Sequence, residues 1–260
     1  PPVVLSNGYP GDWLPRPYLP PHPPEVDRSR KEMIQRAQAR KSIKDRTLIS
    51  LEAFNKILAG GEPDLTSEEM SSSVPWITEA SYHNMVSRLT GTTGNEGFLY
   101  TVSETFADTY ISVYLYVEPG WDTKVKDWLE VTGRTGVGQH RSWGKGGFRV
   151  LEFAAFHGFV RPSHPNAFIS LSNFVPSASD PTEGFYRTLV KYGKVDPTLS
   201  TGGSPFKHSL LMFAAGSMFH TGREPKQFYG RLVEGISPAH PEVVQYGLAL
   251  AVPAQVPSAS

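Results

Sequence analysis

The sequence predicts a protein of mixed α+β class, not a helical bundle. Residues 110–117 (YISVYLYV) alternate strongly between side-chain types, which is typical of a strand. Apolar residues then recur at helical spacing, at Trp121, Val125, Trp128 and Leu129. The chain also carries 24 glycines and 23 prolines among its 260 residues, which indicates many turns and long loops.

The same periodicities predict further elements along the chain. Helices are expected at 27–39 with Asp27 as the cap, at 51–58 before Gly60 and Gly61, and at 185–192. Strands are expected at 47–51, 98–105, 148–153, 168–174, 209–219 (bent at Gly216) and 246–252. Gly158 and the RPSHP run at 161–165 interrupt the pattern. They predict a first module at 1–157 and a strand-rich second module at 158–260.

The segment 1–21 is rich in proline, which removes N–H donors and fixes φ. We therefore expect neither a helix nor a central strand in this arm, and no backbone ladder of its own. Burial of the arm should instead come from its side chains, of which Trp13 and Tyr18 are the largest.

Composition excludes several classes of protein. The sequence has no cysteine, so disulfides, thiolate catalysis and cysteine metal sites are excluded. No run approaches the roughly 18 apolar residues of a membrane span, and no signal-peptide pattern opens the chain. We expect a cytoplasmic protein with no membrane partner, cofactor or metal. Because the net charge is zero, partners must be inferred from local charge.

One stretch, 131–150 (VTGRTGVGQHRSWGKGGFRV), is rich in glycine, basic and aromatic residues and has no acidic residue. Glycine lets a backbone approach a ligand closely, and exposed N–H groups in such a loop form a nest suited to anions. Aromatic rings add surfaces on which bases stack. Together these residue types indicate a phosphate-bearing polymer as the ligand. The candidate binding residues are Gly133, Gly136, Gly138, His140, Arg141, Ser142, Trp143 and Lys145.

The position of this loop argues against a nucleotide cofactor. Its predicted order is strand, helix, glycine loop, strand, whereas a dinucleotide fingerprint places its glycines between a strand and the following helix. The phosphate-binding Walker pattern is also absent. A flexible surface hairpin rich in glycine is the remaining alternative.

Two further groups of polar residues fit a nucleic-acid ligand. Between positions 28 and 46 there are eight basic residues and two acidic ones, directly before the predicted strand at 47–51. A basic segment beside a sheet edge is a common nucleic-acid footprint. Its candidates are Lys41, Lys44 and Arg46. The second group, near a predicted turn, comprises His83, Asn84 and Arg88.

Several segments together resemble a known family. The run GRTGVGQHRSWGKGGF resembles the glycine-rich loop of the repeat-associated RNA-binding proteins of CRISPR systems. More narrowly, four segments in order resemble subunit four of the type III-A (Csm) interference complex. They are LSNGYPGDWLPRPYLPP, KSIKDRTLISLEAF, HNMVSRLTGTTGNEGFLYTVSETF, and the C-terminal pair MFAAGSMF and HPEVVQYGLALAVP.

The resemblance implies ferredoxin-like, RNA-recognition-type α+β modules and a non-catalytic, RNA-binding role. It implies a subunit that grips the 5′ tag of crRNA and joins the large polymerase-and-nuclease subunit to the backbone filament subunit. Family members begin with a strand and a helix before the SNGYP-like segment. This sequence has neither, so we expect a fold that lacks both.

Two other functions stay open at this point. Relatives of similar fold include metal-independent endoribonucleases that process repeat RNA, which need a histidine general acid or base. His83 and His140 are the candidates, and the sequence supplies no compact His–Lys–Tyr set around them. A protein-binding adaptor that uses the proline-rich arm is the other alternative.

Overall fold

Short strands make up most of the regular structure. The computed structural model describes residues 1–20, 29, 34, 46–61, 76–84, 86, 91, 99–138, 141–196, 199 and 204–256. Its helices are α2 (Leu51–Leu58), α3 (Asp122–Thr135) and the 3-10 helix η1 (Arg141–Trp143). The first strands are β1 (Val3–Pro10), β2 (Leu14–Pro15), β3 (Leu48–Ile49), β4 (Trp76–Asn84), β5 (Leu99–Ala107) and β6 (Ile111–Val117). The later strands are β7 (Ala167–Ser170), β8 (Gly184–Phe185), β9 (Thr188–Lys191), β10 (Leu210–Phe213), β11 (Met218–His220), β12 (Phe228–Gly230) and β13 (Leu248–Ala254).

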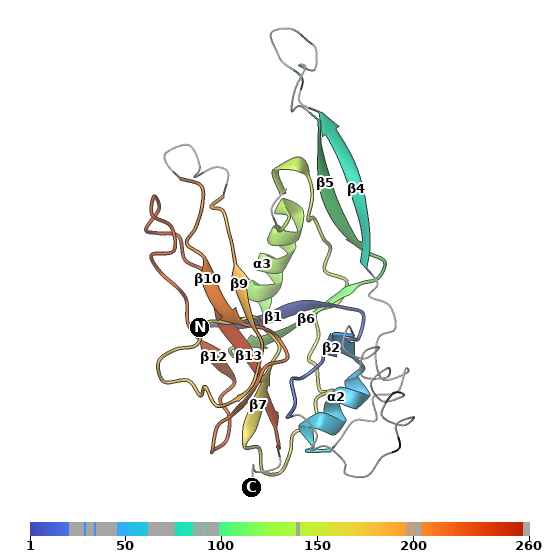
Figure 1. Ribbon diagram of the computed structural model, residues 1–260, viewed down its shortest axis with the longest axis vertical. Helices are drawn as coiled ribbons and strands as arrows, with labels where there is room; N and C mark the ends of the chain where they lie inside the picture. Colours follow the sequence, from blue (N-terminus) through green and yellow to red (C-terminus); the bar gives the residue numbers. More distant parts are fainter. Residues whose placement is uncertain are drawn as a thin grey trace.

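Antiparallel pairing joins these strands into one larger sheet and several two-stranded ones. The larger sheet has the order β12-β13-β7-β11-β8. Separate ladders join β1 with β6, β2 with β3, β4 with β5, and β9 with β10. In Figure 1 the hairpin β4–β5 projects from the body, away from α2 and the larger sheet. The predicted α+β class is confirmed: helices are few and the sheets are antiparallel in the described part of the chain.

Helix α2 forms for local reasons, and its predicted bounds of 51–58 and closing glycines are confirmed. Ser50 adopts an extended conformation at the N-cap, and its hydroxyl oxygen accepts a hydrogen bond from the Ala53 N–H at 3.2 Å. At the other end, the Gly60 N–H donates to the Ile57 carbonyl at 3.0 Å, and Gly60 has a φ of +80°. The buried residues of the helix lie on one face, which packs on β13.

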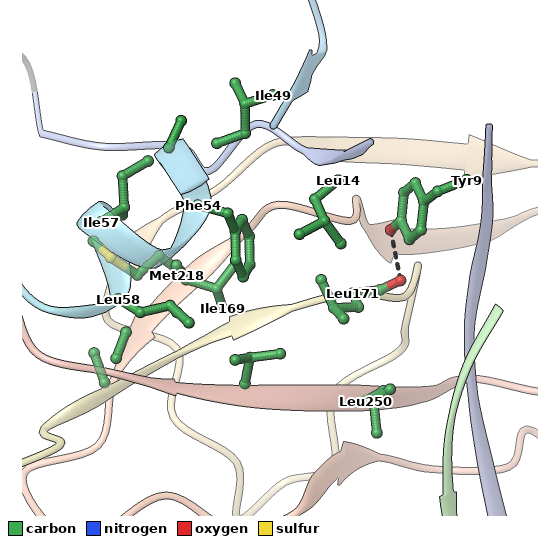
Figure 2. Close-up of a cluster of buried hydrophobic side chains, with 14 of the residues drawn as sticks. Tyr9, Leu14, Ile49, Phe54, Ile57, Leu58, Ile169, Leu171, Met218 and Leu250 are labelled. Carbon is green, nitrogen blue, oxygen red and sulfur yellow. Dashed lines mark hydrogen bonds between the residues drawn. The ribbon is translucent and has the colours of Figure 1, made fainter. Parts of the chain in front are cut away.

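The main hydrophobic core lies between α2 and the larger sheet (Figure 2). Its fully buried side chains come from distant parts of the sequence and include Leu14, Ile49, Phe54, Ile169 and Met218. Residues on both sides of the predicted boundary at 157/158 therefore share one core. The division into two ferredoxin-like modules stays a prediction.

The N-terminal arm corrects one expectation. Residues 3–10 form a strand that pairs antiparallel with β6, so the arm does have a backbone ladder. The prolines of this part of the arm lie before the strand or at its last position, and the residues between them keep their N–H groups. A register shift between Leu5 and Gly8 bends the strand. The arm then continues into β2, where Leu14 is fully buried.

Polar contacts fix the arm against the larger sheet. The Tyr9 hydroxyl donates to the Leu171 carbonyl at 2.7 Å, and the Asn7 N–H donates to the same oxygen at 2.8 Å. Burial raises the pKa of the Tyr9 phenol. The buried Ser172 hydroxyl donates to the Leu5 carbonyl at 2.8 Å, so a second polar link joins the arm to the chain beyond β7.

Three other predicted elements are wrong. Residues 185–192 form no helix, because Thr188–Lys191 pairs with Leu210–Phe213 as strand β9. The predicted strand at 209–219 is two strands in different sheets, since the chain turns at Gly216, whose φ is +85°. Residues 148–153 form no strand, because the Phe148 N–H bonds to the Gly133 carbonyl of α3 at 3.1 Å.

The predicted helix at 27–39 lies outside the described residues, apart from two isolated positions. Within the described ranges, no helix combines the length and the apolar character that a membrane crossing requires.

Candidate nucleic-acid interface

The hairpin β4–β5 places side chains well outside the core. Its strands pair in continuous register from Trp76 opposite Ala107 to Asn84 opposite Leu99. Near the outer end the large side chains of Tyr82 and Leu99 are 75% and 71% exposed. The pairing sets His83 directly opposite Tyr100. The hairpin is therefore a projecting element that has surface available for a ligand or a partner.

Helix α3 leads into the glycine loop, which we define as residues 136–147. Gly133 was predicted to lie in the loop, but it is a buried residue in the last turn of α3. A Cβ at Gly133 would lie 2.4 Å from the Phe148 carbonyl oxygen, so this glycine permits close packing. Gly136 caps the helix with a φ of +78°, and its N–H donates to the Thr132 carbonyl at 2.8 Å.

The glycine loop folds back on itself instead of forming an open nest. The Val137 N–H donates to the Gly146 carbonyl at 2.9 Å, and the Gly144 N–H donates to the Arg141 carbonyl at 3.0 Å. A Cβ at Gly146 would lie 1.8 Å from the Val137 carbonyl oxygen, so only glycine allows this closure. Two of the expected anion-binding N–H groups are thus used inside the loop.

The closed loop brings Trp143 and Lys145 onto the hairpin. The Trp143 ring lies 5.6 Å from the His83 ring, and the His83 ring stacks on Tyr100 at 5.5 Å with an interplanar angle of 19°. The Nε2 atom of His83 is buried and has no hydrogen-bond partner among the described residues. Trp143 itself is 49% exposed, so part of its ring still faces solvent.

An ion pair holds the loop beside this aromatic stack. The Lys145 ammonium lies 2.9 Å and 3.0 Å from the two carboxylate oxygens of Glu104, and the Ser81 hydroxyl donates to Glu104 at 3.1 Å. The hydrogen bond from Lys145, and secondarily that from Ser81, lowers the pKa of the Glu104 carboxyl. We call Ser81, His83, Tyr100, Glu104, Trp143 and Lys145 the junction.

A second ion pair ties the loop to the C-terminal part of the chain. Arg141 pairs with Asp196, which follows strand β9. The loop therefore lies between two antiparallel elements, the hairpin β4–β5 and the β9–β10 pair. The two cations of the loop, Arg141 and Lys145, both have carboxylate partners.

The structure brings together only part of the predicted set. Of the predicted binding residues, it gathers His83, Arg141, Trp143 and Lys145 around the closed loop, together with Gly136. Gly138 is exposed in the same loop. Asn84 lies at the exposed end of β4. Arg46 precedes β3 beside α2, and it has no hydrogen bond or ion pair with the junction among the described residues. Lys41, Lys44, Arg88, His140 and the Ser142 side chain lie outside the described part.

Sequence reasoning missed Ser81, Tyr100 and Glu104 in the junction. It also missed Asp196. A signal was present for the first three, because SYHN and FLYTVSET are two alternating segments separated by a glycine- and threonine-rich turn. If the two segments are paired as a hairpin, His83 comes to lie beside Tyr100. Asp196 gave no comparable signal, since it is 55 residues from Arg141.

Comparison with solved structures gives a consistent result. The chain is similar to one in the crystal structure of a Csm1–Csm4 cassette in complex with cA4, with a TM-score of 0.51, 15% identity, and coverage of 98% of this chain and 80% of that one. A chain in the crystal structure of a Csm3–Csm4 subcomplex of the type III-A CRISPR-Cas interference complex matches with a TM-score of 0.57, 14% identity, and coverage of 98% and 84%. The chain shares their fold.

Csm4 is the component that these two structures have in common. The resemblance to subunit four of the type III-A complex, predicted from the residues, is thereby confirmed at the level of fold. No protein-family model matches the sequence, and no curated protein matches it.

Proposed function

We propose that the protein is a non-catalytic, RNA-binding subunit of a type III CRISPR effector complex that grips the 5′ tag of crRNA. The observation that carries this proposal is a fold shared over 98% of the chain with structures that contain Csm4. The junction and the adjoining part of the glycine loop supply suitable chemistry, because exposed aromatic rings lie beside two cations, Lys145 and Arg141. Proteins that bind single-stranded RNA use this combination of stacking and charge.

The junction residues would have distinct roles in this proposal. The exposed part of the Trp143 ring would stack on a base, and the His83–Tyr100 stack would hold that ring in position. A phosphate would replace the Glu104 carboxylate as the partner of Lys145, and another would replace Asp196 as the partner of Arg141. Such an exchange conserves the number of ion pairs that the two cations make, while Glu104 keeps its hydrogen bond from Ser81.

The proposal includes two protein partners. The similar solved structures pair Csm4 with Csm1 in one case and with Csm3 in the other. We propose that this chain likewise joins the large polymerase-and-nuclease subunit to the backbone filament subunit. Co-purification of the chain with each of these subunits separately would test both contacts, and failure with either one would remove that partner.

RNA binding is tested with two tryptophans of nearly equal exposure. Trp143 is 49% exposed in the junction and Trp128 is 48% exposed on α3. Loss of a base–aromatic stack of about 1–3 kcal/mol corresponds to roughly 5- to 150-fold in affinity. Fluorescence anisotropy with RNA that carries a repeat-derived 5′ tag should show this loss in Trp143→Ala and little change in Trp128→Ala. Equal affinities in the two variants would remove Trp143 from the site.

The contribution of charge is tested separately. Lys145→Ala should lower the slope of log affinity against log salt by roughly 0.7, the value for one phosphate contact with a single strand. Lys126→Ala, on the exposed side of α3, is the control of equal charge change. Crosslinking in the assembled complex is a further test. If the tag RNA crosslinks to neither residues 83–84 nor residues 136–147, the alternative function as a protein-binding adaptor gains support.

One observation favours the alternative of a metal-independent endoribonuclease. The sequence suggests no compact His–Lys–Tyr set, yet the structure gathers His83, Tyr100 and Lys145 around Glu104. One feature opposes catalysis by this set: the Nε2 atom of His83 is buried, so it cannot reach a scissile phosphate. Cleavage of repeat RNA by the pure protein in EDTA, lost in His83→Ala, would establish the alternative.

A further inference from the structure

The β9–β10 pair is longer than its two strands. Its register runs from Thr188 opposite Phe213 to Lys191 opposite Leu210. Beyond the strands, Lys194 pairs with Phe206 through an isolated bridge, and the Lys207 N–H donates to the Gly193 carbonyl at 2.9 Å. We call residues 188–195 with 205–213 the ribbon. In Figure 1 β9 and β10 lie to the left of α3, and the hairpin β4–β5 lies to its upper right.

The outer part of the ribbon carries three lysines without a counter-charge. Lys191, Lys194 and Lys207 form no ion pair with any carboxylate in the described part of the chain. The Lys207 side chain lies over Gly193, where a Cβ would be 3.4 Å from its Cδ. The Lys194 ammonium lies 5.2 Å from the centre of the Phe206 ring. Backbone pairing and these contacts thus hold the side chains of Lys194 and Lys207 on the outer part of the ribbon.

The charges of Lys191 and Lys207 repel each other. Partial burial, and secondarily the charge of Lys207, lowers the pKa of the Lys191 ammonium. No carboxylate in the described part of the chain forms an ion pair with either lysine to offset this repulsion. A bound anion would relieve the repulsion, so the arrangement is more favourable with a ligand than without one.

Aromatic side chains accompany the lysines. Tyr192 is 80% exposed and Phe206 is 58% exposed, so both rings offer a face to solvent. By the register of the ribbon, Lys194 shares a face with both rings, whereas Lys191 and Lys207 lie on the other face. Exposed rings beside cations are the pattern on which single-stranded nucleic acid stacks while its phosphates are neutralised. An acidic protein surface would match the charge but would give no reason for rings of this exposure.

The ribbon also adjoins the glycine loop. Asp196, at the outer end of the ribbon, is the partner of Arg141 in that loop. A strand that displaces Asp196 from Arg141 would have its next phosphates within the neighbourhood of Lys194. The basic path from Lys145 through Arg141 therefore continues along the ribbon.

From this arrangement we propose that the β9–β10 ribbon is a second binding surface for the phosphate backbone of single-stranded RNA, continuous with the junction. The choice of RNA as ligand rests on the proposed function, and the location of the surface rests on the ribbon itself. A strand long enough to leave the junction would follow the ribbon, with bases against Tyr192 and Phe206 beside Lys194. Its phosphates would reach Lys191 and Lys207 across the edge of the ribbon.

The test uses the full chain and oligouridylates of two lengths. A strand of about 5 nucleotides fills one compact single-strand site, and one of about 16 nucleotides extends beyond it. The double variant K191Q/K207Q should leave binding of the short strand unchanged. It should weaken binding of the long strand and lower its salt slope by about 1.4, which corresponds to two phosphate contacts. The matched control K56Q/K226Q removes two charges from α2 and from the segment before β12, and should leave both strands unaffected.

A second pair of substitutions separates binding from folding. K191R/K207R keeps both charges and should retain the salt slope of the parent chain. K191Q/K207Q removes a repulsion and should have a thermal midpoint no lower than that of the parent. A loss of RNA binding together with an unchanged or higher midpoint therefore identifies the ribbon as a binding surface.

The results also separate this inference from the proposed function. If K145A weakens both strands and K191Q/K207Q weakens neither, the ribbon is not an RNA surface and the inference is overturned. If K191Q/K207Q weakens binding of the long strand while K145A has no effect on binding, the ribbon is confirmed as an RNA surface and the junction is not one. If K191Q/K207Q binds RNA like the parent but loses a protein subunit of the complex, the ribbon is a surface for an acidic protein and the inference is again overturned.

Discussion

Closure of the glycine loop can be tested by replacing either of two of its glycines with alanine. Gly144 and Gly146 have nearly the same backbone conformation, with φ of +77° and +71°. They differ in their surroundings. A Cβ at Gly144 meets nothing within 4 Å, whereas a Cβ at Gly146 would lie 1.8 Å from the Val137 carbonyl oxygen. Gly144→Ala is therefore a control for conformational strain without the clash.

The magnitudes follow from this difference. Alanine in the left-handed region costs about 1–2 kcal/mol, and this cost applies to both variants. Gly146→Ala must in addition move backbone atoms, because no flexible side chain can yield, and it loses the Val137–Gly146 hydrogen bond of 2.9 Å. Such a bond contributes about 0.5–1.5 kcal/mol, so the open loop should be roughly 2- to 10-fold more populated in Gly146→Ala than in Gly144→Ala.

Limited trypsin digestion measures that population, because the loop carries cleavage sites after Arg141 and Lys145. When opening is fast relative to cleavage, the cleavage rate follows the fraction of open loop. We expect both variants to be cut faster than the parent chain, and Gly146→Ala faster than Gly144→Ala by the factor given above. Equal rates in the two variants would show that the close approach of Val137 and Gly146 does not hold the loop shut.

Other predictions concern the core and the electrostatics of the junction. Tyr9→Phe should lower the free energy of unfolding by about 1 kcal/mol in urea titrations, because it removes one of two donors to the Leu171 carbonyl and leaves the other; a loss above about 3 kcal/mol would mean that this oxygen is left unpaired. Phe54→Ala should cost about 3–5 kcal/mol, since the ring is fully buried, and a smaller change would show that the core collapses into the space. The Glu104 carboxyl should titrate below the ordinary glutamate value in carbon NMR, and Lys145→Ala should raise its pKa. The stability that the Lys145–Glu104 contact contributes is therefore fully present above the unfolded-state pKa of Glu104 and is lost as pH falls through the lower folded-state pKa. An unchanged Glu104 pKa in Lys145→Ala would contradict the assignment.

Local signals in the sequence predicted some elements well. Helix α2 was predicted with its bounds because its closing glycines follow it directly. The serine cap and the apolar face that the structure adds lie within the same dozen residues or so. Strands β6 and β13 were found because they alternate or form an uninterrupted apolar run. In each of these cases the residues that decide the structure are close together in the sequence.

Contacts between distant segments were not predictable in the same way. The proline content of the arm hid strand β1, because the positions of the prolines decide the outcome and β6 supplies the partner. Gly133 was assigned to the loop because its role depends on Phe148, which is a neighbour only after the chain has turned back. In the candidate site, the sequence indicates the cations Arg141 and Lys145, but their partners come from distant segments, Glu104 from β5 and Asp196 from the chain after β9.

The links between the N-terminal arm and the larger sheet have a consequence during synthesis. The Leu5 N–H bonds to the Tyr246 hydroxyl across 241 positions of sequence. At ribosomal rates of about 5–20 residues per second, roughly 10–50 s separate the appearance of these two residues. For that time strand β1 lacks part of its docking surface, and it depends on the later β6 for a ladder. Prolines at the borders of β1 limit its pairing with other chains during this interval.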